Sequence, residues 1–296
     1  MHYTLHQLQI FLTISQHKSI TKASEELHLT QPAVSIQLKK FQEQFSIPLT
    51  EVVGRQLYIT DFGMEIARAA EKILNEVEAI NYKTMAYRGE LAGKIKISVV
   101  STGKYVMPYF LSGFTWEHKG VDLVMDVTNK ARVIESLEAN EVDFALVSVI
   151  PDNLKVNRIE LMENKLYLVG GSRLMDRGTV KPQRIFSDYP LLYREQGSAT
   201  RNAMETFIRK KNLPTYKQMT LTSNEALKQA VIAGLGYSIM PIIGLKNALH
   251  NKEIRIIPFK GLPITTHWNL IWLKSKNLSP TAVAFLDYLE AHKSDI

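Results

Sequence analysis

The sequence contains no cysteine among its 296 residues. This absence excludes disulfides, thiol nucleophiles and thiolate metal sites, and it fits a reducing cytoplasm. No apolar run approaches the length needed to cross a bilayer. The first residues, 1–5, also lack the basic stretch and apolar core that begin a signal peptide. We therefore expect a cytoplasmic protein that makes no contact with a membrane.

The common catalytic and metal-binding patterns are absent as well. The eight histidines are scattered, and no pair has the spacing of a metal site. There is no Gly-x-x-x-x-Gly-Lys phosphate loop and no Gly-x-Ser-x-Gly elbow. Gly234 and Gly236 follow an expected helix and precede an expected strand, which is the wrong order for dinucleotide binding. We expect no catalytic residue, no metal and no cofactor, and an enzyme with an unrecognised site is the less favoured alternative.

Length and charge indicate several domains of different character. A chain of this length exceeds an ordinary single domain. The net charge is +7, but residues 1–90 hold nine Lys and Arg against ten Asp and Glu, whereas residues 91–296 hold 27 against 19. The positive excess of the second part is either a solubilising surface or a complement to an anionic ligand. Bulk charge therefore gives little support for DNA binding by the first part.

The first sixty residues carry the pattern of a helix-turn-helix. Apolar residues at helical spacing predict a helix over residues 5–16, and Ser19 is placed to cap a second helix over residues 20–27. Thr30 is placed to cap a third helix, with Pro32 in its first turn, where a missing N–H is tolerated. Two short helices joined by a tight turn form this DNA-binding unit.

The third helix divides into two faces. Val34, Leu38, Phe41 and Phe45 recur at helical spacing and are expected to point into the core. Residues at the start of a recognition helix meet base edges and phosphates, and an exposed isoleucine suits a thymine methyl group. The predicted DNA-contacting residues of this helix and its cap are Thr30, Gln31, Pro32, Ser35, Ile36 and Lys39. The alternative is a plain three-helix bundle with one stray exposed isoleucine.

Two further features follow in the chain. β-prone runs on both sides of Gly54 predict a short hairpin, the wing, with Arg55 at its tip facing the phosphate backbone. Thr60 then begins a long expected helix that extends to about residue 88 and carries an apolar seam with alternating steps of four and three. We expect this seam to pair with a second subunit, although it could instead pack on its own domain. The predicted dimerisation residues are Ile66, Ala70, Ile73, Val77 and Ile80.

The last two hundred residues alternate between strands and helices. This pattern predicts parallel or mixed sheets with flanking helices, arranged as one doubly wound sheet or as two smaller lobes. The expected strands lie at residues 95–100, 121–127, 143–149, 166–169, 191–193, 220–222, 237–239 and 268–273.

Three strand-to-helix junctions are rich in hydroxyl, amide and glycine residues: Ser101-Thr102-Gly103, Gly197-Ser198-Ala199-Thr200-Arg201 and Thr222-Ser223-Asn224-Glu225. Ligands of open α/β sheets bind at the carboxyl ends of strands, and free N–H groups at a helix start favour an anion. Arg201 is a natural clamp for a carboxylate or phosphate. Each junction taken singly could be only a helix cap, but together, in a basic domain, they favour a small anionic metabolite as ligand. The predicted ligand contacts are Ser101, Thr102, Asn129, Thr200, Arg201 and Asn224.

The ordered motifs resemble LysR-type transcriptional regulators. The segments 19–27 and 29–35 and the pattern Leu57-x-Ile59-Thr60-x-x-Gly63 occur in the order and spacing of that family. Segments such as Val99-Val100-Ser101-Thr102 and Gly261-Leu262-Pro263-Ile264 are similar to the subgroup that regulates Calvin-cycle (RuBisCO) operons, whose effectors are phosphorylated metabolites and nucleotides. One departure is Thr50, which stands after Leu49 where the family usually has phenylalanine. It places a polar group where a core aromatic is expected and puts the packing of the wing in question.

The resemblance implies an α/β fold class, with an N-terminal winged helix-turn-helix and linker helix and a C-terminal effector domain like a two-lobed type 2 periplasmic binding protein. The implied partners are double-stranded promoter DNA, a second copy of the chain in a dimer or tetramer, and RNA polymerase. A solute-binding protein of transport is the main rival, and the attached helix-turn-helix argues against it. The expected domains are 1–60, 61–89 and 90–296, with lobe I at 94–164 and 267–296 and lobe II at 165–266.

Overall fold

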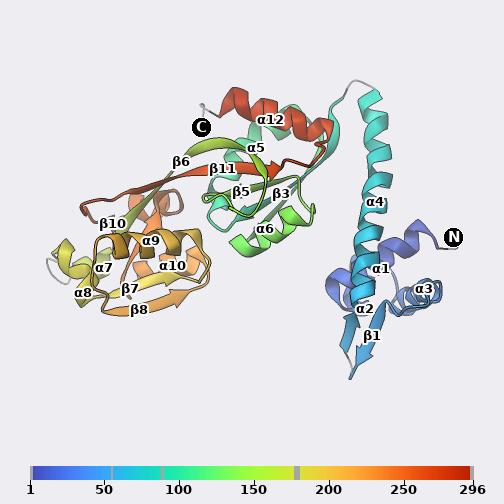
Figure 1. The fold of residues 1–296 in the computed structure, drawn as a ribbon, viewed down its shortest axis with the longest axis horizontal. Helices are drawn as coiled ribbons and strands as arrows, with labels where there is room; N and C mark the ends of the chain where they lie inside the picture. The colour runs from blue at the N-terminus through green and yellow to red at the C-terminus, as the bar shows by residue number, and fades with distance from the viewer. Residues whose placement is uncertain (1–2, 55, 88–89, 177–180, 294–296) are drawn as a thin grey trace. The chain divides into compact units, whose positions relative to one another are not determined.

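The computed structural model describes residues 3–54, 56–87, 90–176 and 181–293. The chain forms two compact units, Met1–Glu90 and Leu91–Ile296. The first consists of helices with one small hairpin, and the second contains a long mixed sheet flanked by helices (Figure 1). The expected α/β class and the two-part architecture are confirmed.

Each of the three short helices begins at a capping side chain. They are α1 (Leu5–His17), α2 (Ile20–Glu26) and α3 (Gln31–Gln42). The hydroxyls of Thr4, Ser19 and Thr30 accept hydrogen bonds from first-turn N–H groups at 3.2, 3.3 and 3.4 Å. Between α2 and α3, His28 adopts a left-handed backbone with φ of 53°, which gives the tight turn. The predicted helix-turn-helix is confirmed.

The inner face of α3 forms the core of the first unit. Val34 and Phe41 are fully buried and Leu38 is 8% exposed. The Phe41 ring lies 5.2 Å from that of Phe11 on α1 and 5.1 Å from that of Phe45. Burying each of these large side chains contributes about 1.5–3 kcal/mol, so this face orients α3 and leaves the opposite face to solvent.

The wing is present as a two-stranded hairpin of β1 (Thr50–Val53) and β2 (Gln56–Ile59). Gly54 turns the chain with φ of 65°, which favours glycine. Arg55, predicted at the tip, lies outside the described residues. Thr50 pairs with Ile59 at the base of the hairpin, and its neighbour Leu49 is fully buried. The wing therefore forms with a half-buried Thr50 at the position where the family usually has phenylalanine.

The long helix α4 (Asp61–Tyr87) starts against the base of the wing. The Thr60 hydroxyl accepts from the Gly63 N–H at 2.9 Å and donates to the Pro48 carbonyl at 2.7 Å. A Cβ added at Gly63 would lie 2.0 Å from the Leu49 carbonyl oxygen, so only glycine permits this close approach.

The apolar seam of α4 is divided between two environments. Ala70 is 1% exposed and Ile66 packs beside it in the core of the first unit. Ile73 and Ile80 are 40% and 61% exposed, and Val77 is half-buried. Ile66 and Ala70 thus pack on their own domain, which was the alternative to pairing with a second subunit. Ala70 was predicted as a dimer contact, but it is buried in the core of its own domain.

One mixed sheet runs through the second unit, in the order β4-β3-β5-β11-β6-β9-β7-β8, with β10 paired to β6. Strand β3 is parallel to β4 and β5, and β7 is parallel to β8 and β9. The strands are β3 (Ala92–Val100), β4 (Gly120–Thr128), β5 (Phe144–Val147), β6 (Val156–Gly171), β7 (Pro190–Arg194), β8 (Lys217–Leu221), β9 (Tyr237–Pro241), β10 (Ile254–Ile256) and β11 (Ile264–Leu273).

Two long antiparallel strands join the two ends of this sheet. One end of β11 pairs with β5 and one end of β6 pairs with β9, so both strands belong to two lobes (Figure 1). Their pairing shifts register between Trp268 and Asn269. The expected strand at 166–169 was too short, and β10 was not expected. In the first half of β6, exposed Arg158 and Glu160 alternate with buried Ile159 and Leu161. This part of the strand therefore contains no continuous apolar run that would indicate it in the sequence.

Helices cover both faces of the sheet (Figure 1). One apolar core lies around Phe114, Phe144 and Phe285, and another around Phe186 and Tyr237. The helical segments are η1 (Gly103–Tyr105), α5 (Met107–Glu117), α6 (Lys130–Glu138), α7 (Ser172–Met175), η2 (Pro182–Arg184), α8 (Ile185–Asp188), α9 (Ala199–Lys210), α10 (Asn224–Ile232), η3 (Ile242–Leu245), α11 (Lys246–His250) and α12 (Pro280–His292).

Candidate functional site

The outer face of α3 presents polar, apolar and basic groups side by side. Gln31, Pro32 and Lys39 are exposed, and Ser35 is half-buried. Ile36 is 54% exposed, although its aliphatic side chain would favour burial. Thr30 is exposed at the edge of this face, and its hydroxyl accepts the capping hydrogen bond of α3. The arrangement suits insertion into a groove that offers hydrogen-bonding edges, a methyl group and phosphates.

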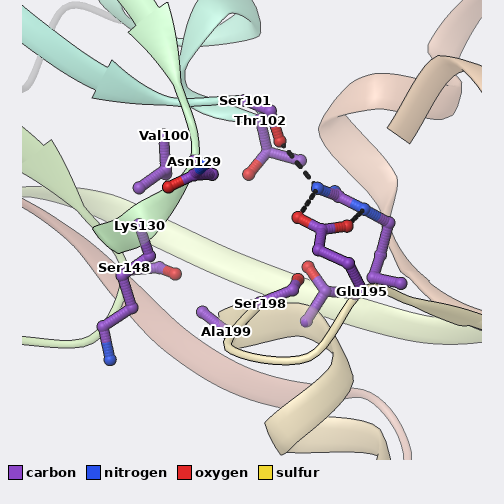
Figure 2. A pocket seen from close by; sticks show the side chains of 11 residues that line it. Val100, Ser101, Thr102, Asn129, Lys130, Ser148, Glu195, Ser198 and Ala199 are labelled. Carbon is purple, nitrogen blue, oxygen red and sulfur yellow. Dashed lines mark hydrogen bonds and ion pairs between the residues drawn. The ribbon is translucent and has the colours of Figure 1, made fainter. Parts of the chain in front are cut away.

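The second unit contains a cavity at the carboxyl ends of four strands (Figure 2). Ser101 follows the end of β3, Asn129 that of β4, Ser148 that of β5 and Glu195 that of β7. Counted to its open mouth, the cavity measures about 310 Å³. Its lining residues are Val100, Ser101, Thr102, Asn129, Lys130, Ser148, Arg194, Glu195, Ser198, Ala199 and Thr200.

Two cationic residues line this cavity, Lys130 and Arg194, and Arg194 is the buried one of the two. Its side chain is only 4% exposed, so little of this cation contacts bulk solvent. The guanidinium donates through Nε and Nη2 to the two oxygens of Glu195, at 2.8 and 2.7 Å, and through Nη2 to Ser101 Oγ at 3.2 Å (Figure 2). A buried guanidinium of this kind binds a carboxylate or phosphate through two parallel hydrogen bonds.

The start of α9 adds backbone donors. By helix geometry its first N–H groups have no acceptor within the helix, and Ala199 and Thr200 of this turn line the cavity. The cap residue Ser198 is buried, and its side chain makes no capping hydrogen bond. An anion in the cavity would therefore meet N–H donors and the positive end of the helix dipole.

Four of the six predicted ligand residues line the cavity: Ser101, Thr102, Asn129 and Thr200. Asn129 also caps α6, and its Oδ1 accepts from the Arg132 N–H at 3.0 Å. Asn224 lines a smaller neighbouring cavity of about 200 Å³ and supports the site indirectly, because its Nδ2 donates to Ser101 Oγ at 3.0 Å.

Arg201 does not line the cavity, contrary to its predicted role as the clamp. Its Nε donates to Glu205 at 2.7 Å, its Nη1 donates to the Arg194 carbonyl at 3.1 Å, and its guanidinium lies 5.5 Å from the centre of the Tyr193 ring. Burial raises the pKa of Tyr193 to about 12. Arg201 therefore positions the backbone of Arg194, and Arg194 is the residue that faces the cavity.

Contacts between the two lobes surround the cavity. Ser101 is bound by Arg194 and Asn224, and the Tyr105 hydroxyl donates to Glu225 Oε2 at 3.2 Å. Burial raises the pKa of Tyr105, and the Glu225 carboxylate adds to the shift. The pKa of Glu225 is lowered, first by its hydrogen bond with Lys228 and then by Gln229.

Comparison with known proteins identifies both units. Residues 5–64 match the family model for bacterial regulatory helix-turn-helix proteins of the lysR family, and residues 88–294 match the model for the LysR substrate binding domain. The chain belongs to the LysR family. It is a DNA-binding transcription regulator with an effector-binding domain, of a family that is not enzymatic.

Relatives of this LysR-type chain include regulators of RuBisCO operons, as the sequence resemblance indicated. It is 35% identical over 291 residues to the transcriptional activator CmpR of Synechocystis sp., covering 98% of this chain and 95% of CmpR. It is 33% identical over 296 residues to the RuBisCO operon transcriptional regulator of Acidithiobacillus ferrooxidans, covering 99% and 96%. Among solved structures, the CcmR regulatory domain of Synechocystis in complex with 2-PG is similar, with a TM-score of 0.63, 28% identity and coverage of 69% of this chain and 99% of that one.

Among the described residues of this LysR-type chain, no helix is both long and apolar enough to cross a bilayer. The same residues contain no group of three or more metal-ligating side chains placed to hold an ion.

Proposed function

We propose that this LysR-type regulator binds a small anionic metabolite in the cavity around Arg194. The observation that carries this proposal is the nearly complete burial of that guanidinium, beside the start of α9. The proposed contacts are Arg194, Ser101, Thr102, Asn129 and Thr200. We propose that the cavity lies between two lobes, with lobe I at 94–164 and 267–296 and lobe II at 165–266.

The chemistry of a relative's ligand supports the same class of effector. The similar CcmR domain is in complex with 2-PG, or 2-phosphoglycolate, which is an anion. A phosphate or carboxylate group matches a guanidinium flanked by hydroxyls and helix N–H groups. We infer that the effector carries at least one such group, and we propose no cofactor or metal besides it.

We also propose that the outer face of α3 reads DNA in the major groove. Gln31 and Ser35 would contact base edges, Ile36 a thymine methyl, and Lys39 a phosphate, with Thr30 and Pro32 at the rim. The wing, including Arg55, would contact the neighbouring backbone. We infer that this occurs in the cytoplasm, where bacterial promoter DNA lies.

The proposed regulation follows from linkage between the two ligands. An effector that binds one arrangement of the lobes more tightly shifts the population toward it, and the affinity for DNA or RNA polymerase changes with that population. Residues 61–89 would connect the two events as the dimerisation helix.

Binding of DNA and effector by the same protein is the direct test. We expect the full chain to protect an interrupted, inverted repeat in DNA upstream of a gene that it regulates, with affinity that falls as salt rises. Addition of 2-phosphoglycolate or inorganic phosphate should change the footprint. A footprint that is indifferent to anions at constant ionic strength would remove the effector proposal and leave the DNA proposal intact.

Dimerisation through α4 predicts a specific effect of charge on the open part of the seam. Ile73→Asp combined with Val77→Asp should convert dimers to monomers in sedimentation velocity at micromolar concentration. Each carboxylate would be buried in the helix pair without a partner, which costs several kcal/mol. The control Lys72→Asp places the same charge at a neighbouring exposed position and should leave the dimer intact. Unchanged sedimentation of the double variant would contradict pairing through this seam.

A further inference from the structure

Glu195 occupies the position where an anionic ligand of Arg194 would bind. Both of its carboxylate oxygens accept hydrogen bonds from the guanidinium, at 2.8 and 2.7 Å. This two-point contact is the geometry that an incoming carboxylate or phosphate would itself adopt. Glu195 also lines the cavity, together with Ser101, which binds the same guanidinium nitrogen at 3.2 Å (Figure 2).

The two partners of this ion pair differ in their access to water. The Arg194 side chain is 4% exposed and the Glu195 side chain is 24% exposed. Gln196 and Gly197, which follow Glu195, are exposed, and Gly197 has φ of 85°. The carboxylate can therefore move toward solvent, whereas the guanidinium cannot. A buried cation left without its partner is costly, so it needs a replacement anion.

We propose that Glu195 is a built-in counter-anion, which the effector must displace from Arg194 in order to bind. This inference rests on the proposed effector site and adds a residue that sets its affinity. Every anion that binds Arg194 through two hydrogen bonds competes with the same tethered carboxylate. Glu195 thus lowers the affinity for all such anions by a common factor. Cellular anions that bind weakly do not displace Glu195 from Arg194.

The position of Glu195 also connects ligand binding to the neighbouring helix. The Ser198 N–H donates to the Glu195 carbonyl at 3.2 Å, and Ser198 is the cap residue of α9. Glu195 thus stands in the short link between the end of β7 and the start of α9, and both ends of this link contribute residues to the cavity.

The test compares Glu195→Gln with the natural chain by calorimetric titration with inorganic phosphate and with 2-phosphoglycolate. Glutamine keeps the size of the side chain and loses the charge. We expect both ligands to bind about tenfold more tightly to Glu195→Gln. This factor corresponds to an Arg194 guanidinium that is free of Glu195 about a tenth of the time in the natural protein. Glu195→Asp keeps the charge on a shorter side chain and should show a smaller gain.

The control is Asp188→Asn, which removes a carboxylate from the Arg184–Asp188 ion pair of the same lobe, away from the cavity. It should leave both affinities unchanged. Equal or weaker binding by a folded Glu195→Gln protein would overturn the inference, because Glu195 would then hold Arg194 in place for the ligand. Binding that is detected only after Glu195→Gln would support it. If neither protein binds either anion, the proposed effector site itself fails.

Discussion

Replacing Arg194 with alanine is expected to weaken binding of 2-phosphoglycolate or phosphate by about 100-fold or more. A hydrogen bond to a charged group contributes about 1.5–3 kcal/mol, and a two-point contact supplies two of them. Arg194→Lys keeps a point charge without the planar pair of donors, so it should recover only part of the loss. Isothermal titration of the full chain measures both variants, and circular dichroism checks that they remain folded.

Arg184→Ala is the matched control, because Arg184 is 70% exposed and pairs with Asp188 away from the cavity. It should bind the effector as the natural chain does. Arg201→Ala is expected to fall between the two, since it loses only the hydrogen bond to the Arg194 carbonyl. If Arg201→Ala were as damaging as Arg194→Ala, the ligand would depend on Arg201 directly. Normal effector affinity in Arg194→Ala would refute the proposed site.

On the DNA-binding unit, Gln31→Ala and Ser35→Ala are each expected to weaken binding to the specific site by about tenfold, and to relax base preference at the position contacted. One base contact is worth about 1–3 kcal/mol of discrimination, whereas binding to random DNA does not depend on it. Lys39→Ala should weaken both kinds of binding and reduce the salt dependence by about one counterion. Fluorescence anisotropy at several salt concentrations measures all three.

Lys72→Ala serves as the control for charge, because it removes a lysine from the exposed surface of α4. It should change neither base preference nor the affinity for the specific site. Effector binding should be natural in every α3 variant, since the residues altered lie in the other compact unit. Unaltered specificity in both Gln31→Ala and Ser35→Ala would exclude α3 as the reader of bases.

The helix-turn-helix was predictable because its determinants are local. Thr4 begins α1 with a reciprocal capping box, and Ser19 and Thr30 begin the next helices within single turns. The periodicity of one helix then separates buried Val34 and Phe41 from exposed Ile36. A side chain that caps its own helix needs no distant partner, so the pattern of residues is sufficient.

The ligand cavity was predictable only in outline. Strand ends and helix starts are visible in a sequence, and they led to Ser101, Thr102, Asn129 and Thr200, which do line the cavity. The choice between Arg194 and Arg201 was not visible. Arg201 stands in the first turn of a helix, where clamps are common, but packing against Tyr193 directs it to Glu205 and to the Arg194 carbonyl.

A similar limit applied to α4, whose seam reads as one continuous stripe along the sequence. Packing divides it, since Ala70 is buried in its own domain while Ile73 is exposed. Helical spacing indicates which residues share a face of α4. It does not indicate how much of that face is covered by the core of the first domain.

The amino-acid sequence was thus enough for the family, the helices of the DNA-binding unit and the excess positive charge of the second unit. The sequence could not identify Arg194 as the cation of the proposed effector site, because counting charges does not distinguish one lysine or arginine from another. In the folded chain the Arg194 side chain is buried to 4% exposure and is hydrogen-bonded to Glu195. Burial strengthens that single interaction, while the exposed charges are screened by water and salt.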